Sequence, residues 1–229
     1  MEGIYFHAGR IVVKIGSSTI VNAERRFNFK IAEALAEDIV KLKRAGKDVL
    51  LVSSGAIALG RNGHSSELDK RIAAAKGQVA LMTGWREVFA MHAIDVCQVL
   101  VSNGCQIDFN ALSSATTQLV INGNDVIEET NNDLVASKVA RNTNADLLVL
   151  LTNVDGYLDG TGKRVSSMDA HSAQFDASTF SEFGTGGIAT KLQAIREAAI
   201  TAVIANGTEH TVLSRILAGE DVGTLVRGE

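Results

Sequence analysis

Residues 10–20, RIVVKIGSSTI, place a lysine and a glycine turn at the end of an apolar, β-branched run. Such a run is typical of a buried strand, and Gly16 predicts where that strand ends. A cation beside a flexible turn indicates an anion site, because backbone N–H groups of Gly16 and Ser17 would lie next to the ammonium group of Lys14. Taken alone, Lys14 could equally be a strand-end lysine that reaches solvent.

The rest of the chain alternates between apolar strands and amphipathic helices. Further strands are predicted at residues 48–55, 94–102, 117–125, 145–156 and 201–207. Helices are predicted at residues 28–46, 66–93, 131–143 and 184–200, the second of them interrupted near Gly77 or Gly84. Strands that are apolar throughout and separated by helices predict a mostly parallel sheet covered on both faces, in a single α/β domain spanning residues 1–229.

Polar and small residues gather directly after four of the predicted strands. They are Lys14, Gly16 and Ser17; Ser53, Ser54 and Gly55; Asn122, Asn124 and Asp125; and Thr152, Asn153 and Asp155. In open α/β sheets, ligands bind outside the carboxyl ends of the strands. The four segments therefore predict one binding crevice at that edge of the sheet.

Two of the turns are rich in small residues and lead into helices. Residues 53–60, SSGAIALG, would let a ligand approach the backbone at a helix N-terminus, which favours an anion. Residues 184–191, GTGGIATK, place three glycines before a helix and a lysine in its first turns, although they match neither the P-loop nor the GxGxxG pattern.

Residues 156–164, GYLDGTGKR, are interpreted as a hairpin or loop tip. Asp133 alone is interpreted more readily as a helix cap than as a ligand-binding residue.

Composition narrows the class of protein. The net charge is −4 with no basic tail, which argues against a nucleic-acid or membrane-surface partner. No apolar run approaches the ~20 residues of a spanning helix, and the first residues lack a secretion signal, so a cytoplasmic protein is expected. Two cysteines are too few for a disulfide framework and are expected to be plain thiols. The five histidines lack metal-site spacing, so no metal site is expected.

Several motifs together resemble the amino acid kinase family, from about residue 11 to residue 225. They are VVKIGSS, VSSGAIALGR, INGND, NNDLVASKVA, LLTNVDG, GTGGIATKLQA and GEDVGTL. SSGAIALGR and GTGGIATKL are similar to the glutamate 5-kinase branch of that family. The resemblance implies a three-layer αβα sandwich and transfer of the γ-phosphoryl group of ATP, carried with Mg²⁺, to the side-chain carboxylate of L-glutamate, the first step of proline biosynthesis. A kinase for another small acid and a non-catalytic, ligand-binding relative are the alternatives.

The resemblance also implies roles for individual residues. Lys14 would contact the transferred phosphoryl group, Lys191 the β- and γ-phosphates, and Asp133 would orient both lysines. The implied substrate-binding positions are Ser54, Gly55, Ala56, Asn122, Asp125 and Asn132. The implied ATP-binding positions are Lys14, Gly16, Ser17, Thr152, Asn153, Asp155, Thr185, Gly186, Gly187 and Lys191.

The resemblance also implies partner proteins, and two segments of the chain differ from the usual family pattern. It implies a homo-oligomer, a dimer or tetramer, and glutamate-5-semialdehyde dehydrogenase as the next enzyme of the pathway. The C-terminal RNA-binding-like (PUA) domain that many relatives have is expected to be absent. The family usually has Asn-Glu-Asn-Asp where this chain has residues 122–125, Asn-Gly-Asn-Asp, and Gly-Asp-Asn-Asp where it has residues 130–133, Thr-Asn-Asn-Asp. Loss of two carboxylates near the acceptor site could change which acid is phosphorylated.

Overall fold

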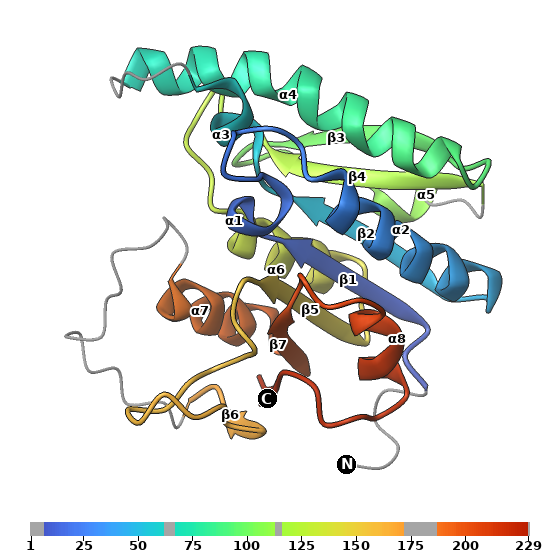
Figure 1. Cartoon of the computed structure of the whole chain (residues 1–229), viewed down its shortest axis with the longest axis vertical. Helices are drawn as coiled ribbons and strands as arrows, with labels where there is room; N and C mark the ends of the chain where they lie inside the picture. The colour runs from blue at the N-terminus through green and yellow to red at the C-terminus, as the bar shows by residue number, and fades with distance from the viewer. Residues whose placement is uncertain (1–6, 62–66, 113–115, 172–186, 229) are drawn as a thin grey trace.

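The computed structural model describes residues 7–61, 67–112, 116–171 and 187–228. These residues form an eight-stranded sheet in the order β3-β4-β2-β1-β5-β7-β8-β6 (Figure 1). The strands are β1 (Arg10–Ile15), β2 (Asp48–Ser53), β3 (Asp95–Val101), β4 (Thr117–Gly123), β5 (Leu147–Thr152), β6 (Ser167–Asp169), β7 (Ala202–Asn206) and β8 (Thr224–Arg227). The strands from β3 to β7 in this order pair in parallel, whereas β8 runs antiparallel to β7 and parallel to β6. The predicted mostly parallel sheet is confirmed.

Helices cover both faces of the sheet. They are α1 (Ser17–Ile20), α2 (Phe29–Arg44), α3 (Ala56–Gly60), α4 (Glu67–Ala90), α5 (Phe109–Leu112), α6 (Asn132–Asn142), α7 (Ile188–Ala198) and α8 (Val212–Leu217). Alternate residues of β1 enter two separate apolar cores: Val13 and Ile15 pack with α2, α4 and α8, and Val12 packs with α6 and α7. Figure 1 shows α2 and α8 on the near side of the sheet and α6 on its far side. The three-layer αβα sandwich is therefore confirmed.

The glycines of α4 serve helix packing and do not interrupt the helix. α4 runs unbroken from Glu67 to Ala90, so the predicted interruption near Gly77 or Gly84 is wrong. A Cβ atom on Gly77 would lie 1.7 Å from the carbonyl oxygen of Ala56 in α3, and one on Gly84 would lie 2.5 Å from the ring of Phe27. The missing side chains let α3 and the residues before α2 approach the backbone of α4.

We expect Gly77→Ala to destabilise the protein by roughly 1–3 kcal/mol, because the new methyl group has no room against the backbone of α3 and overpacking has about this cost. Urea unfolding would measure the change. Gly160→Ala is the matched control, since a Cβ atom there meets nothing within 4 Å. Equal stability of the two variants would contradict the proposed close contact between α3 and α4.

The loop after β5 contains the hairpin that the sequence predicts. Leu158 and Arg164 form an antiparallel bridge, and Asp159 accepts hydrogen bonds from the backbone N–H groups of Thr161 and Lys163 across the tip. The tip therefore closes on itself through a carboxylate. This confirms the interpretation of GYLDGTGKR as a loop tip.

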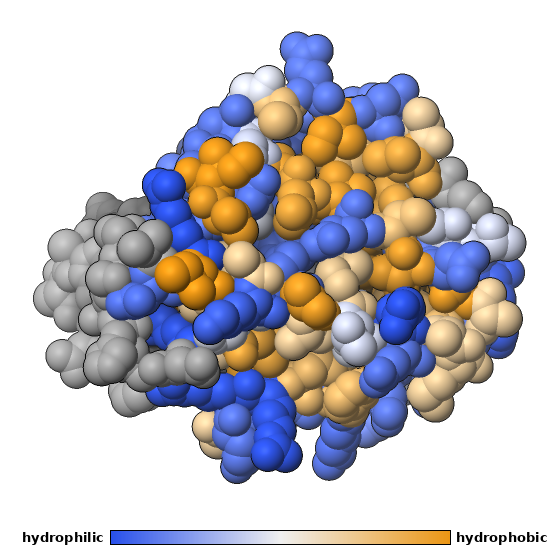
Figure 2. Space-filling view, turned by 90° about the horizontal axis from the view of Figure 1, so that it is seen from above, coloured by the Kyte–Doolittle hydropathy of each residue, from blue (hydrophilic) through white to orange (hydrophobic). Residues whose placement is uncertain are grey.

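The surface over α4 and the edge strand β3 exposes several apolar side chains. Figure 2 looks onto α4 and shows apolar side chains gathered among hydrophilic ones. Ile72 and Val79 of α4, Met91 beyond it, and Leu100 of β3 are among the exposed large hydrophobic residues.

Cys97 and Cys105 are free thiols, as expected, and both are exposed. Among the described residues, no helix has the length and apolar character needed to cross a membrane.

Candidate functional site

The polar ends of four strands meet at one edge of the sheet. β4, β2, β1 and β5 are consecutive neighbours and run parallel, so their carboxyl ends point the same way. Ile15 at the end of β1 is level with Ser53 on one side and Leu151 on the other. The predicted shared edge is therefore confirmed. β7 adds a fifth polar end, Asn206, level with Thr152.

Two buried lysines flank one buried aspartate at this edge. The ammonium nitrogen of Lys14 lies 2.7 Å from Oδ1 of Asp133, and that of Lys191 lies 3.2 Å from Oδ2. The three side chains are only 7 %, 7 % and 1 % exposed for Lys14, Lys191 and Asp133. Lys14 shares the sheet face of Val12, which is why it meets α6 and α7. The structure thus brings together the three residues that the resemblance implies for catalysis.

Asn131 caps the start of α6, so the carboxylate of Asp133 can pair with the two lysines. The side chain of Asn131 caps the helix, accepting a hydrogen bond from the N–H of Asp133 at 2.9 Å. The alternative interpretation of Asp133 as the cap is therefore wrong. The hydroxyl group of Thr190 in α7 lies 3.3 Å from Oδ2 of Asp133, a contact that the sequence patterns did not single out.

The charges of this cluster perturb one another. Burial alone would raise the pKa of Asp133, but Lys14 and Lys191 together bring this pKa below its ordinary value. Burial lowers the pKa of Lys14, Asp133 opposes that effect, and the cation of Lys191 adds to it. One carboxylate thus holds two cations in a buried place with a net positive charge. Such a place favours an anionic ligand.

Gly16 lies beside the ammonium group of Lys14. Its N–H donates to the carbonyl oxygen of Leu151 at 3.2 Å, so the predicted anion nest is wrong for this N–H group. Its φ of −78° is accessible to any residue. A Cβ atom on Gly16 would, however, lie 3.8 Å from the ammonium nitrogen of Lys14, so a larger side chain would stand over the cation.

The two serines at the end of β2 have different surroundings. The hydroxyl oxygen of Ser53 accepts a hydrogen bond from the indole N–H of Trp85 at 2.9 Å, in the core under α4. The N–H of Ser54 donates to the carbonyl oxygen of Ile15 at 3.0 Å, which fixes the turn beside β1. Gly55 follows with φ of 116°, a conformation that favours glycine, and precedes the buried Ala56 at the start of α3.

The end of β4 is tied to both neighbouring helices. The side-chain amide of Asn122 is 1 % exposed and donates to Gln78 of α4 at 2.9 Å. The N–H of Gly123 donates to the side-chain oxygen of Asn132 in α6 at 2.9 Å. Asp125 is half-buried, and burial raises its pKa although hydrogen bonds from Thr130 act against the rise.

The ends of β5 and β7 form a second polar group. The side-chain amide of Asn206 donates to Asp155 at 2.9 Å, and the hydroxyl group of Thr152 lies 3.4 Å from the side-chain oxygen of Asn153. Asn206 was missed, although the same rule, a polar residue at a strand end, would have found it. Gly187 is exposed immediately before α7. The two remaining implied ATP-binding residues, Thr185 and Gly186, lie outside the described residues.

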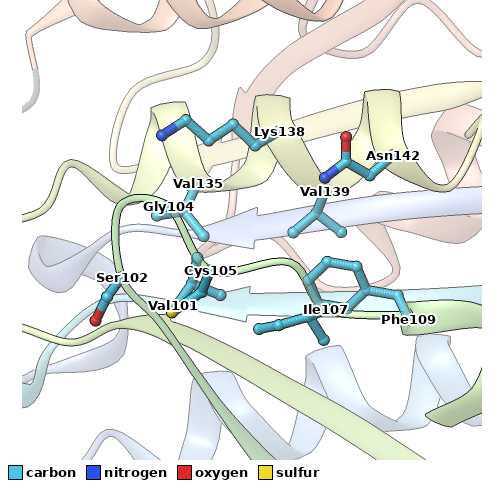
Figure 3. A pocket seen from close by; sticks show the side chains of 10 residues that line it. All are labelled: Val101, Ser102, Gly104, Cys105, Ile107, Phe109, Val135, Lys138, Val139 and Asn142. Carbon is cyan, nitrogen blue, oxygen red and sulfur yellow. The ribbon is translucent and has the colours of Figure 1, made fainter.

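A cavity of about 290 Å³ lies between the loop after β3 and the side of α6. Figure 3 shows its lining, in which Val101 and Phe109 face Val135 and Val139, with Lys138 at the margin. None of the site residues implied by the sequence lines it.

Comparison with known proteins assigns the chain to a family. The model of the amino acid kinase family matches residues 9–206. The chain belongs to the amino acid kinase family. A glutamate 5-kinase of Lactiplantibacillus plantarum is 32 % identical over 95 % of this chain and 96 % of its own length. A glutamate 5-kinase of Caulobacter vibrioides is 36 % identical over 99 % of this chain and 70 % of its own length.

Solved structures share the fold of this family. A UMP kinase from Bacillus anthracis superposes with a TM-score of 0.70 at 18 % identity, covering 97 % of both chains. An N-acetylglutamate synthase from Neisseria gonorrhoeae superposes with a TM-score of 0.69 at 17 % identity, covering 96 % of this chain and 62 % of that one. At such identities the likeness concerns the fold alone.

Proposed function

We propose that this amino acid kinase phosphorylates the side-chain carboxylate of L-glutamate with ATP to give L-glutamyl 5-phosphate. The observation that carries the proposal is the pair of buried lysines held by Asp133 at the carboxyl edge of the sheet. Within the described residues, Asp133 is the one partner of the Lys14 ammonium group, which has three N–H donors. Two donors are therefore left for a phosphoryl group. The relatives named glutamate 5-kinase support the choice of acceptor.

The chemistry requires positioning more than proton transfer. A glutamate carboxylate has an ordinary pKa of ~4.3, so it is already ionised at neutral pH and needs no general base. One carboxylate oxygen forms a bond to the γ-phosphorus, the bond from this phosphorus to the bridging oxygen breaks, and ADP leaves with the electron pair. Lys14 and Lys191 would lower the repulsion between the two anions and stabilise charge on the phosphoryl oxygens.

ATP would lie along the ends of β5 and β7 and the start of α7. Thr152, Asn153 and Asp155 offer hydrogen-bonding groups there, and Gly187 leaves the N-terminus of α7 open to phosphates. Within the described residues, no group of three or more His, Cys, Asp or Glu side chains is arranged to hold a metal ion. Mg²⁺ commonly binds through substrate phosphates and water, and we propose that it arrives with ATP.

The acceptor would bind between the ends of β2 and β4. Ser54 and the backbone N–H groups near it would hold a carboxylate, and Asp125 would pair with the ammonium group of the amino acid. We therefore expect Asp125→Asn to raise the KM for L-glutamate about tenfold, the loss typical of one ion-paired hydrogen bond, with a much smaller effect on the KM for ATP. Steady-state kinetics would measure both constants, with the exposed Asp95→Asn as control. Equal effects on both substrates would show that Asp125 has a structural role instead.

A panel of acceptors tests the function directly. Acyl phosphates react with hydroxylamine to give hydroxamates, so hydroxamate and ADP should form together only when L-glutamate is present. L-Aspartate, glutarate and N-acetyl-L-glutamate serve as competing acceptors. Hydroxamate formation with one of these instead would assign the chain to another acid. Gly123 and Asn131 favour that alternative, because each stands where the family usually has a carboxylate. Binding of ATP without turnover of any acceptor would favour a non-catalytic relative.

We also propose that a second copy of the chain covers the apolar surface over α4 and β3. Exposed apolar patches are frequent at protein–protein contacts, and the outer edge of β3 has no neighbouring strand among the described residues. Sedimentation should then show a homo-oligomer that the substitution Val79→Glu dissociates. A monomeric wild-type protein would overturn this arrangement.

A further inference from the structure

The side chain of Thr130 fills the space that a side chain on Gly123 would need. The two residues lie at opposite ends of the loop between β4 and α6. A Cβ atom on Gly123 would lie 1.6 Å from the hydroxyl oxygen of Thr130 and 2.5 Å from its Cβ atom. The φ angle of Gly123 is not in the left-handed region, so the backbone does not require glycine there. The side chain of Thr130 is therefore the reason that position 123 has none.

Thr130 uses this position to hold Asp125. Its N–H and its hydroxyl group both donate to Oδ1 of Asp125, at 3.0 Å and 2.8 Å. In the described part of the chain, no donor contacts the other oxygen, Oδ2. Two hydrogen bonds that converge on one oxygen fix the rotation of a carboxylate and leave its second oxygen for another partner.

Hydrogen bonds tie this loop to the start of α6, the helix that carries Asp133. Gly123 donates its N–H to Asn132, and Asn131 accepts the N–H of Asp133, both at 2.9 Å. The residues from Gly123 to Asp133 thus link the half-buried carboxylate of Asp125 to the carboxylate that holds the two lysines. A small displacement of Thr130 would move Asp125 relative to the site of phosphoryl transfer.

We infer that Thr130 is a positioning residue that orients Asp125 so that Oδ2 receives the ammonium group of an amino-acid acceptor, and that Gly123 provides the space this requires. The inference rests on the proposed function. It adds that Thr130 should affect the binding of the acceptor and leave the binding of ATP unchanged.

Substitution of the hydroxyl group tests the positioning role. Thr130→Val has nearly the same shape and keeps the N–H donor, whereas Thr130→Ser keeps the hydroxyl group. We expect Thr130→Val to raise the KM for L-glutamate about tenfold, as for one hydrogen bond to a charged group, and to change the KM for ATP by less than about twofold. Thr130→Ser should restore values close to those of the wild type.

The outcomes separate this inference from the proposed function. An active wild-type enzyme whose Thr130→Val variant has an unchanged KM for L-glutamate, or equal changes for both substrates, would overturn the positioning role alone. A wild-type protein that forms no hydroxamate with L-glutamate would overturn the proposed function as well.

The close contact between positions 123 and 130 can be tested by thermal unfolding, without an activity assay. Gly123→Ala should lower the melting temperature by several degrees, because the methyl group collides with Thr130. In the background of Thr130→Gly, where that side chain is gone, the same substitution should lower it far less. Additive effects of the two substitutions would contradict the direct contact between residues 123 and 130.

Discussion

Lys14→Met and Lys191→Met are each expected to lower kcat by about 10²- to 10³-fold, the usual effect of removing one group that stabilises charge in a transition state. Methionine keeps an unbranched apolar side chain in a position that is almost fully buried, so packing should change little. Loss of the Lys14 ammonium group should have this effect because, within the described residues, Asp133 is its one partner, which leaves N–H donors for a phosphoryl group. Single-turnover measurement of ADP formation would isolate the chemical step.

Lys30→Ala on the exposed surface of α2 is the control for loss of a positive charge. It should leave kcat unchanged, because long-range charge is screened within about 10 Å at ordinary ionic strength. A Lys14 or Lys191 variant that retains near wild-type turnover would show that the lysine concerned balances Asp133 and takes no part in transfer. Circular dichroism of each variant would establish that the fold is intact.

The architecture could be predicted because strand patterns are local. β1 was predicted to end before Gly16, as it does in the structure, because its apolar run stops there. The residues from Ile11 to Ile15 are all buried on one face of the sheet or the other. The shared edge of the site followed from the same reasoning, because parallel strands bring their carboxyl ends together whatever their order. Lys14 could therefore be placed at the site before its partners were known.

Long-range contacts could not be predicted in this way. The sequence shows Gly77 as a helix breaker, and only the backbone of α3 explains its presence. Asp38 lies on the buried face of α2, where an apolar residue is expected, and accepts hydrogen bonds from the N–H of Leu213 and the hydroxyl group of Ser214 at the start of α8. Those partners lie 175 and 176 residues away in the chain. β6 has three residues and no apolar run, so no pattern indicated it.

The N–H of Gly16 shows the same limit within the site itself. A glycine after a strand can expose its N–H to a ligand or donate it to a neighbouring strand, and the residues alone do not distinguish the two. In the sheet, β5 lies beside β1 and its Leu151 takes the hydrogen bond. What Gly16 contributes to the site is its position, because a Cβ atom there would lie 3.8 Å from the ammonium nitrogen of Lys14.

Asp133→Asn is expected to destabilise the protein by about 3–5 kcal/mol at neutral pH, the usual effect of removing one partner from a buried ion pair. The substitution leaves the ammonium groups of Lys14 and Lys191 buried without their shared counter-ion. Asparagine has the same shape as aspartate, so the loss would be electrostatic. Urea unfolding would measure it, with the exposed Asp95→Asn as the matched control that should change stability little.

The pH dependence of that loss identifies its cause. In the wild type, Asp133 has a lowered pKa, so its stabilising effect is present above the ordinary value of 3.8 and is lost as the pH falls through the folded-state value. In the variant, Lys14 loses Asp133, the group that opposes the lowering of its pKa by burial, so this pKa should fall further below its ordinary value of 10.5. The cost of burying the charge of Lys14 is then greatest at neutral pH and fades as the pH rises towards that ordinary value. The deficit of Asp133→Asn relative to wild type should therefore shrink between about pH 7 and about pH 9.5. A deficit that stays constant over this range would mean that the residue stabilises the fold by packing, and that the two lysines are not held as cations by Asp133.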